Sequence, residues 1–281
     1  MHYLCPQIIE NLSYKEYTMN ENKQKVAIVN PVDDHTKEVI ERAIADDVAQ
    51  FVSFYGDDAS IRAVECVRSG NADVLMKGAV NTDVLLRAAL DKEHGILEKG
   101  RVMAHISVAN IPGWQRPVIF SDAAVIPRPD ISQMDAIVRY TVDAARNLGI
   151  ECPKVALTNF TEKENPKFPQ TAVYQEIRRR AEEGQYGNVE IGGPMDVKTA
   201  LDAESGSIKG IASPVVGNAD ILLFPNIEAG NTFYKTLTLF AHATIAGWLA
   251  GTQVPVVVTS RADSVESKYY SLITALKMTN R

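Results

Sequence analysis

Short apolar runs rich in β-branched residues alternate along the chain with longer segments whose apolar residues recur every three or four positions. The short runs predict strands at residues 25–30, 51–55, 72–76, 101–110, 117–125, 154–160, 188–191, 220–225 and 255–260. The longer segments predict helices. Strands that are apolar throughout and separated by helices indicate a mostly parallel sheet with helices on both faces, so we expect an α/β fold.

Three details refine this pattern. Asp130 and Gln133 have the spacing of a capping box, and Gly149 marks the end of the helix that they begin. The predicted strands 101–110 and 117–125 are joined only by IPGWQR, which is too short for a helical crossover, so they should pair as an antiparallel hairpin. The segment after residue 230 is apolar almost all round, and we expect one long helix whose large residues, Trp248 included, are buried.

Composition and charge bound the possible functions. The chain has 281 residues and a formal net charge of −6, which disfavours binding to nucleic acids or anionic membranes. Cys5, Cys66 and Cys152 show no disulfide or zinc spacing, which suggests a reducing compartment. The sequence shows neither a signal peptide nor a run of roughly 20 apolar residues, so we expect a soluble, cytoplasmic protein.

Familiar catalytic motifs are missing from the sequence. It contains no GxGxxG, P-loop, HExxH or GxSxG pattern, and its five histidines are scattered, so we expect no metal site. His105 and His242 lie in apolar segments and are expected to be core residues.

Polar residues follow three of the predicted strands, where ligands bind in open α/β sheets. Lys77 and Gly78 follow the predicted strand 72–76. Asn81 or Thr82 would cap the next helix, and Arg87 lies about one and a half turns into that helix. A turn and a capped helix with two solvated basic side chains explain this pattern equally well.

A predicted loop follows the strand at residues 220–225, and the strand at residues 255–260 ends with a hydroxyl beside a guanidinium. The loop contains Asn226, Glu228, Gly230 and Asn231, with Lys235 expected in the first turn of the following helix. Ser260 and Arg261 end the last strand. Asp263 and Glu266 fit a capping box, although either could instead be a catalytic carboxylate. Basic residues after two different strands suggest a ligand that carries phosphate.

Several of these segments resemble the phosphate acetyl/butyryltransferase family, from about Ala72 onward. They are VLMKGAVNTDVLLRAAL, FSDAAV, SPVVGNADILLFPNIEAGNTFYK and PVVVTSRADSVESK, while LTNFTEKENPKFPQT is similar to the butyryl-type branch. The resemblance implies an isocitrate/isopropylmalate-dehydrogenase-like fold with the active site in a cleft between two α/β domains. We expect a first domain of residues 1–116 and 251–281, and an inserted second domain of residues 117–250.

The resemblance also implies a reaction, which is reversible transfer of a short acyl group between coenzyme A and inorganic phosphate. Arg87 and Arg261 would hold the phosphate or acyl phosphate, and Ser260 would orient the thiol or donate to the acyl oxygen. Lys77, Gly78, Asn226, Glu228, Gly230 and Asn231 would bind substrate. The resemblance implies no metal or redox cofactor, coenzyme A as a substrate, and a homodimer or larger homo-oligomer.

Two departures from the acetyl-type pattern favour a butyryl or branched-chain acyl group. The acidic residue that acetyl-type members carry seven positions after the serine is Ser267 here, which leaves Asp263 and Glu266 as candidate bases. An arginine upstream of the Gly-Ala segment also has no match. The alternatives are a phosphate acetyltransferase, a non-catalytic protein that binds coenzyme A or acyl phosphate, and a metal- and NAD-dependent dehydrogenase of the same architecture.

Overall fold

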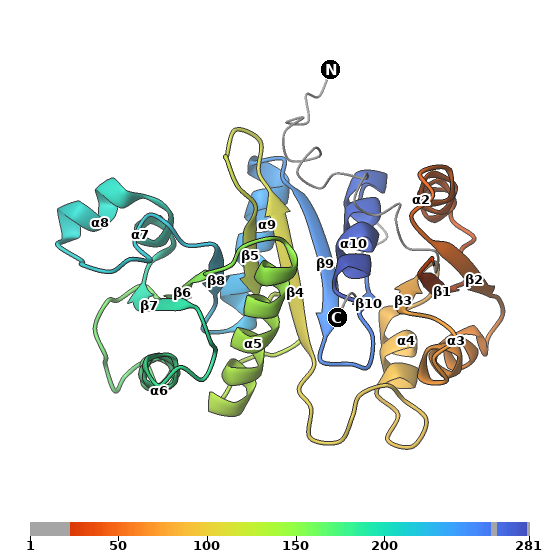
Figure 1. Cartoon of the computed structure of the whole chain (residues 1–281), viewed down its shortest axis with the longest axis horizontal. Helices are drawn as coiled ribbons and strands as arrows, with labels where there is room; N and C mark the ends of the chain where they lie inside the picture. The colour runs from red at the N-terminus through yellow and green to blue at the C-terminus, as the bar shows by residue number, and fades with distance from the viewer. Residues whose placement is uncertain (1–22, 260–262, 280–281) are drawn as a thin grey trace. The chain divides into compact units, whose positions relative to one another are not determined.

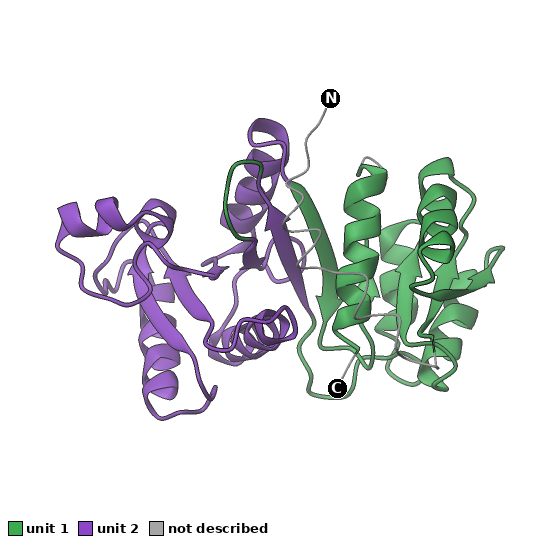
Figure 2. Ribbon diagram, turned by 45° about the horizontal axis from the view of Figure 1, so that its top comes forward, with its two compact units in different colours: residues 1–103, 112–116, 244–281 green, residues 104–111, 117–243 purple. Residues whose placement is uncertain are grey.

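The computed structural model describes residues 23–259 and 263–279, which form alternating strands and helices (Figure 1). Contacts within the chain group its residues into two compact units (Figure 2). Unit 1 comprises residues 1–103, 112–116 and 244–281, and unit 2 comprises residues 104–111 and 117–243. The division into domains at residues 117 and 250 stays a prediction.

Unit 1 is built on strands in the order β2-β1-β3-β10-β9. The pairs β1/β2, β1/β3 and β3/β10 are parallel, and β9 runs antiparallel to β10. Helix α2 packs with α10, and α3 packs with α4. Because β1 to β2 and β2 to β3 cross in opposite directions, right-handed connections place α2 and α3 on opposite faces. The strands are β1 (Lys25–Val29), β2 (Gln50–Phe54), β3 (Val74–Lys77), β9 (Thr244–Ala250) and β10 (Val256–Val257), and the helices are α2 (Asp34–Ala45), α3 (Ala59–Arg68), α4 (Thr82–Ala89) and α10 (Val265–Lys277).

Unit 2 has the strand order β4-β5-β8-β6-β7. Strands β4 and β5 form the predicted antiparallel hairpin, in which Ser107 lies opposite Phe120, and the other pairs are parallel. The strands are β4 (Ala104–Asn110), β5 (Val118–Ser121), β6 (Lys154–Thr158), β7 (Glu190–Met195) and β8 (Ile221–Leu223), and the helices are α5 (Ile131–Asn147), α6 (Gln170–Glu182), α7 (Val197–Leu201), α8 (Ala203–Lys209) and α9 (Ile227–Phe240). The mostly parallel α/β class is thereby confirmed.

Strands β3, β10, β5 and β8 are buried along their whole length, as the unbroken apolar runs predicted. Each predicted strand overlaps an observed one, and the capping box of α5 is confirmed, because Asp130 accepts from the Gln133 backbone N–H at 2.8 Å. Gly149 follows the C-cap Leu148 with a φ of +91°, a conformation that suits glycine.

The single long helix predicted after residue 230 is wrong. Helix α9 ends at Phe240, and the chain turns at His242, whose φ is +51°, before it forms β9. A fully buried strand is apolar on both faces, so its sequence resembles that of a buried helix. Trp248 is buried as expected, with 2% of its surface exposed, but it belongs to this strand. His242 lies exposed in the turn, so its predicted place in the core is also wrong.

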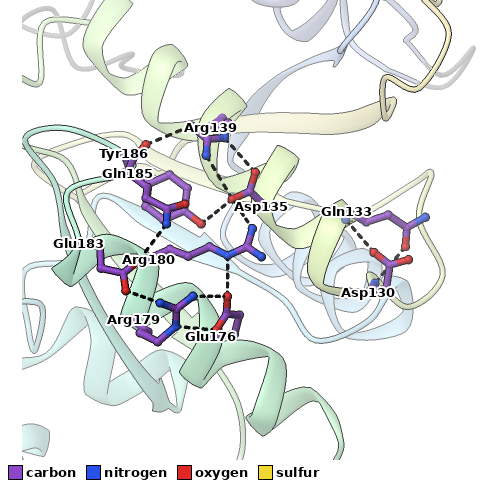
Figure 3. Close-up of polar contacts among 10 residues, drawn as sticks. All are labelled: Asp130, Gln133, Asp135, Arg139, Glu176, Arg179, Arg180, Glu183, Gln185 and Tyr186. Carbon is purple, nitrogen blue, oxygen red and sulfur yellow. Dashed lines mark hydrogen bonds and ion pairs between the residues drawn. The ribbon is translucent and has the colours of Figure 1, made fainter.

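Helices α5 and α6 of unit 2 are joined by a network of ion pairs centred on Asp135 (Figure 3). Its carboxylate accepts from Arg139 at 2.9 Å, from Arg180 at 3.0 Å and from the Tyr186 hydroxyl at 2.8 Å. Burial alone would raise the pKa of Asp135, but these hydrogen bonds outweigh it and hold the pKa below its usual value. The network is completed by Glu176, Arg179, Glu183 and Gln185.

Candidate functional site

Three adjacent parallel strands of unit 1, β1, β3 and β10, end at the same edge of the sheet. Lys77 is the last residue of β3 and only 4% of its surface is exposed. Its Nζ donates to the carbonyl oxygens of Thr259 at 3.3 Å and Gly78 at 3.4 Å. Thr259 immediately precedes the predicted site residues Ser260 and Arg261, which lie outside the described residues. The structure therefore brings the end of β3 against the segment that leads into the predicted Ser-Arg pair.

Thr259 carries a second feature of this edge. The residue is 5% exposed, and its Oγ1 is buried with no hydrogen-bond partner among the described residues. A buried hydroxyl without a partner costs about 1–3 kcal/mol, so such groups commonly mark a place for water or a ligand. A buried ammonium and a buried hydroxyl thus lie side by side at this edge.

Gly78 is explained by the packing of the chain on itself. A Cβ at this position would lie 2.5 Å from the carbonyl oxygen of Val29 and 2.6 Å from that of Asn30. The backbone N–H of Gly78 donates to the Val29 carbonyl at 2.9 Å, which fixes the end of β3 against the end of β1. The interpretation of Gly78 as a ligand contact stays a prediction.

Arg87 lies in the last turn of α4, and 83% of its side chain is exposed. Its guanidinium is 4.0 Å from the Asp83 carboxylate one turn earlier. It lines a hollow of about 390 Å³ together with residues of α3, among them Ser60, Val64 and Arg68. Lys77 is not among the residues that line this hollow.

The predicted capping box of Asp263 and Glu266 is wrong. Helix α10 begins at Val265, and its N-cap is Ser264, whose hydroxyl accepts from the backbone N–H of Ser267 at 3.2 Å. Serine caps a helix as readily as aspartate, which leaves Asp263 half-buried just before the cap. Glu266 instead pairs with Arg42 on α2 at 2.8 Å. The choice of base between these two carboxylates stays a prediction.

The end of β8 in unit 2 differs from the predicted loop. Helix α9 begins at Ile227, and Asn226 is its N-cap, accepting from the backbone N–H of Ala229 at 2.9 Å. Glu228 therefore lies exposed in the first turn, where its charge complements the helix dipole. Lys235 is in the third turn, not the first, and its Nζ lies 4.7 Å from the centre of the Tyr234 ring.

Gly230 and Asn231 fasten α9 to the segment after β5. A Cβ on Gly230 would lie 2.2 Å from the carbonyl oxygen of Asp122, so only glycine allows this approach. Asn231 donates from Nδ2 to the Ala123 carbonyl at 3.0 Å. These contacts are within the protein, and binding of substrate by either residue stays a prediction.

Asp122 is a structural residue that the sequence reasoning did not single out. It is 2% exposed, and its carboxylate accepts three backbone hydrogen bonds, from His105 at 3.0 Å and from Ala124 and Val125 at 2.8 Å. The sequence signal that could have identified it is an aspartate directly after a run of buried strand residues. The ring of the buried His105 lies 3.2 Å from the Ser107 hydroxyl, which confirms His105 as a core residue with a polar partner.

Neither metal-binding clusters nor membrane-spanning helices occur in the part of the chain that the structure describes. Within residues 23–259 and 263–279, no three His, Cys, Asp or Glu residues gather as metal ligands would. None of the helices in these ranges is long and apolar enough to cross a bilayer. Cys66 and Cys152 are free thiols.

Comparison with known proteins relates this arrangement to one enzyme family. The family described as phosphate acetyl/butaryl transferase matches residues 8–276. A phosphate butyryltransferase of Clostridium acetobutylicum is 41% identical over 77% of this chain and 72% of its own length. A phosphate acetyltransferase of Thermotoga maritima is 36% identical over 89% of this chain and 93% of its own.

A solved structure agrees with these relatives. The branched-chain phosphotransacylase of Enterococcus faecalis superposes with a TM-score of 0.80 and 29% sequence identity, covering 92% of this chain and 99% of its own. The sequence match over nearly the whole chain and this structural likeness lead to one conclusion: the chain belongs to the phosphate acetyl/butaryl transferase family.

Proposed function

We propose that this acyltransferase moves a butyryl or branched-chain acyl group reversibly between coenzyme A and inorganic phosphate. The observation that carries the proposal is the 41% identity to a phosphate butyryltransferase over 77% of the chain. The likeness to a branched-chain phosphotransacylase supports the same acyl class. An acetyl group is the alternative, which the phosphate acetyltransferase relative keeps open.

The reaction is a substitution at the acyl carbon. A phosphate oxygen attacks the thioester carbonyl, a carbon–oxygen bond forms, and the carbon–sulfur bond breaks, so that coenzyme A leaves as a thiolate and takes up a proton. In reverse, the thiol loses its proton and attacks the acyl phosphate. Both directions build negative charge on the acyl oxygen, and fixed donors and cations stabilise that charge most effectively where water is excluded.

We assign the binding of phosphate and the stabilisation of the acyl oxygen to residues that follow β3 and β10 in unit 1. Arg87 and Arg261 would hold the phosphate, and Ser260 would orient the thiol or donate to the acyl oxygen. The buried ammonium of Lys77 supports this assignment because it lies 3.3 Å from the carbonyl of Thr259, the residue that precedes Ser260 in the sequence. Gly78 would bind substrate beside Lys77.

In unit 2 we assign substrate binding to the start of α9, with Asn226, Glu228, Gly230 and Asn231. Asp263 or Glu266 would take the thiol proton. Asp263 is half-buried whereas Glu266 is exposed, and we take Asp263 as the first candidate because a carboxylate that is partly shielded from water suits a base better. Coenzyme A is a substrate in this proposal. No redox cofactor takes part, because the transfer changes no oxidation state, and the charges that the proposal invokes come from side chains.

The experiment is to add phosphate to acetyl-, butyryl- and isobutyryl-CoA and follow the release of free thiol. We expect kcat/KM to be highest for butyryl- or isobutyryl-CoA. A higher value for acetyl-CoA would identify a phosphate acetyltransferase. Tight binding of coenzyme A without turnover of any of the three would indicate a non-catalytic binding protein. An NAD- and metal-dependent oxidation without thiol release would indicate a dehydrogenase.

A homodimeric or larger assembly and a cytoplasmic location also stay predictions. The assembly is tested by the mass of the purified protein in solution, measured by light scattering.

A further inference from the structure

A short loop in unit 2 carries an exposed pair of aromatic rings that the roles above leave unexplained. Phe160 and Phe168 lie on the loop between β6 and α6 (Figure 1), with 68% and 37% of their surfaces exposed. The ring centres are 4.6 Å apart, and the rings meet edge to face at 77°. Phe160 buries little of its surface even with Phe168 against it, so packing does not explain why this position is a phenylalanine.

The loop lies at the ligand-binding edge of its sheet. It follows the carboxyl end of β6, which pairs in parallel with β8, and β8 leads into the N-terminus of α9. The Thr158 hydroxyl at the end of β6 donates to the Leu223 carbonyl at the end of β8, at 2.8 Å. The aromatic pair is therefore on the same edge of unit 2 as Asn226.

The loop is held in shape by its own polar side chains. Lys167 N–H donates to the Asn165 side chain at 2.9 Å, and Asn165 N–H donates to the Thr171 hydroxyl at 3.1 Å. That hydroxyl donates in turn to the Phe168 carbonyl at 2.8 Å, and Thr171 is buried. The two rings are thus presented on a fixed scaffold, which lowers the entropy cost of binding a ligand.

The loop also carries four charged residues, and its two lysines are available to pair with a ligand. Glu162 pairs with Lys209, and Glu164 accepts from Gln175. Lys163 and Lys167 are exposed and take part in no ion pair among the described residues. Two exposed aromatic rings and two available lysines on one loop match a planar heterocycle that carries phosphate groups.

We propose that this loop binds the nucleotide end of coenzyme A, with the adenine against Phe160 and Phe168 and the phosphates near Lys163 and Lys167. This inference rests on the proposed function, which makes coenzyme A the substrate. An acyl chain is a poorer occupant, because a four-carbon group needs an enclosed apolar pocket and these rings are open to water. The nucleotide end is the charged, planar part of the substrate and suits an exposed site.

The test compares butyryl-CoA with butyryl-pantetheine, which has the same reacting end and lacks the nucleotide. In Phe160→Ala we expect KM for butyryl-CoA to rise on the order of ten-fold, because stacking on one aromatic ring is worth about that much. The kinetics with butyryl-pantetheine, the KM for phosphate and the preference for butyryl- over acetyl-CoA should stay as in the wild type. The matched control is Phe240→Ala, which removes a ring 76% exposed at the far end of α9 and should change none of these values.

A second variant tests the phosphate contacts. In the double variant Lys163→Gln, Lys167→Gln we expect KM for butyryl-CoA to rise, with a weaker dependence on salt than in the wild type. An equal loss with butyryl-CoA and butyryl-pantetheine would overturn the proposal, as would wild-type kinetics in both variants. A changed acyl preference in Phe160→Ala would move the rings to the acyl chain and would also overturn it. A wild-type enzyme inactive on every acyl-CoA would contradict the proposed function instead.

Discussion

The carboxyl edges of the two units use buried charge in opposite ways. In unit 1, the buried ammonium of Lys77 contacts two backbone carbonyls beside a buried hydroxyl that has no partner among the described residues. In unit 2, the buried carboxylate of Asp122 accepts three backbone N–H groups and thereby fixes the turn after β5. Three N–H donors compensate a buried carboxylate well, whereas the buried Thr259 hydroxyl beside Lys77 still lacks a partner among the described residues. We therefore assign the edge that holds Lys77 and the Thr259 hydroxyl to a ligand, and Asp122 to the fold.

The largest expected effect would separate those two roles. In Lys77→Met we expect kcat/KM to fall on the order of a hundred-fold, because a positive charge near the reacting phosphate is lost. The melting temperature should stay the same or rise, since replacing a buried charge by an apolar residue is often neutral or stabilising. Steady-state kinetics and thermal unfolding measure the two quantities.

Lys235→Met is the matched control for this variant. Lys235 is exposed on α9, in the third turn, so its loss should leave both kcat/KM and stability near the wild-type values. Unchanged kcat/KM in Lys77→Met would break the comparison, because Lys77 would then be a structural residue like Asp122.

Asp122→Ala tests the other edge and should act on stability first. Removing the carboxylate leaves the buried N–H of His105 and the more accessible N–H groups of Ala124 and Val125 without their acceptor, and we expect the free energy of unfolding to fall by about 2 kcal/mol. Urea denaturation measures this loss. Asp122→Asn keeps one carbonyl oxygen as an acceptor and should lose less. A stable Asp122→Ala protein with lost activity would contradict a purely structural role.

The sequence predicted the elements of both edges better than their chemistry. The sequence predicted that Lys77 and Asn226 lie at strand ends, because unbroken apolar runs indicate buried strands. The role of Gly78 could not be read in the same way, because the carbonyls of Val29 and Asn30 that exclude a side chain there lie almost fifty residues earlier. The sequence did not predict the boundary between α9 and β9, because a strand that is buried on both faces shows no period-2 alternation that would distinguish it from a buried helix.

Asp135 extends the comparison to charge that lies away from the edges. We expect Asp135→Asn to cost about 1 kcal/mol at pH 7, since the carboxylate is partly buried and holds Arg139, Arg180 and Tyr186. Because the pKa of Asp135 is lowered in the folded protein, this stabilisation is complete above the unfolded pKa of about 4 and is lost as the pH falls through the folded value.

Urea unfolding of wild type and Asp135→Asn at several pH values follows this prediction. The difference in unfolding free energy should be constant between about pH 5 and 7 and should shrink below about pH 4. A difference that does not change with pH would assign the effect to packing of the side chain. At each of these pH values, Asp135→Asn should release thiol with the same kinetics as the wild type.

The smallest expected effect concerns the two candidate bases of unit 1. Glu266 is 48% exposed and pairs with Arg42 on the surface, so Glu266→Gln should change the free energy of unfolding by less than about 0.5 kcal/mol and leave kcat unchanged. Asp263→Asn is the partner variant, and it should lower kcat and alter its pH profile if Asp263 takes the thiol proton. A large loss of kcat in Glu266→Gln alone would reverse this assignment, since the Arg42 pair would then hold a working base in place.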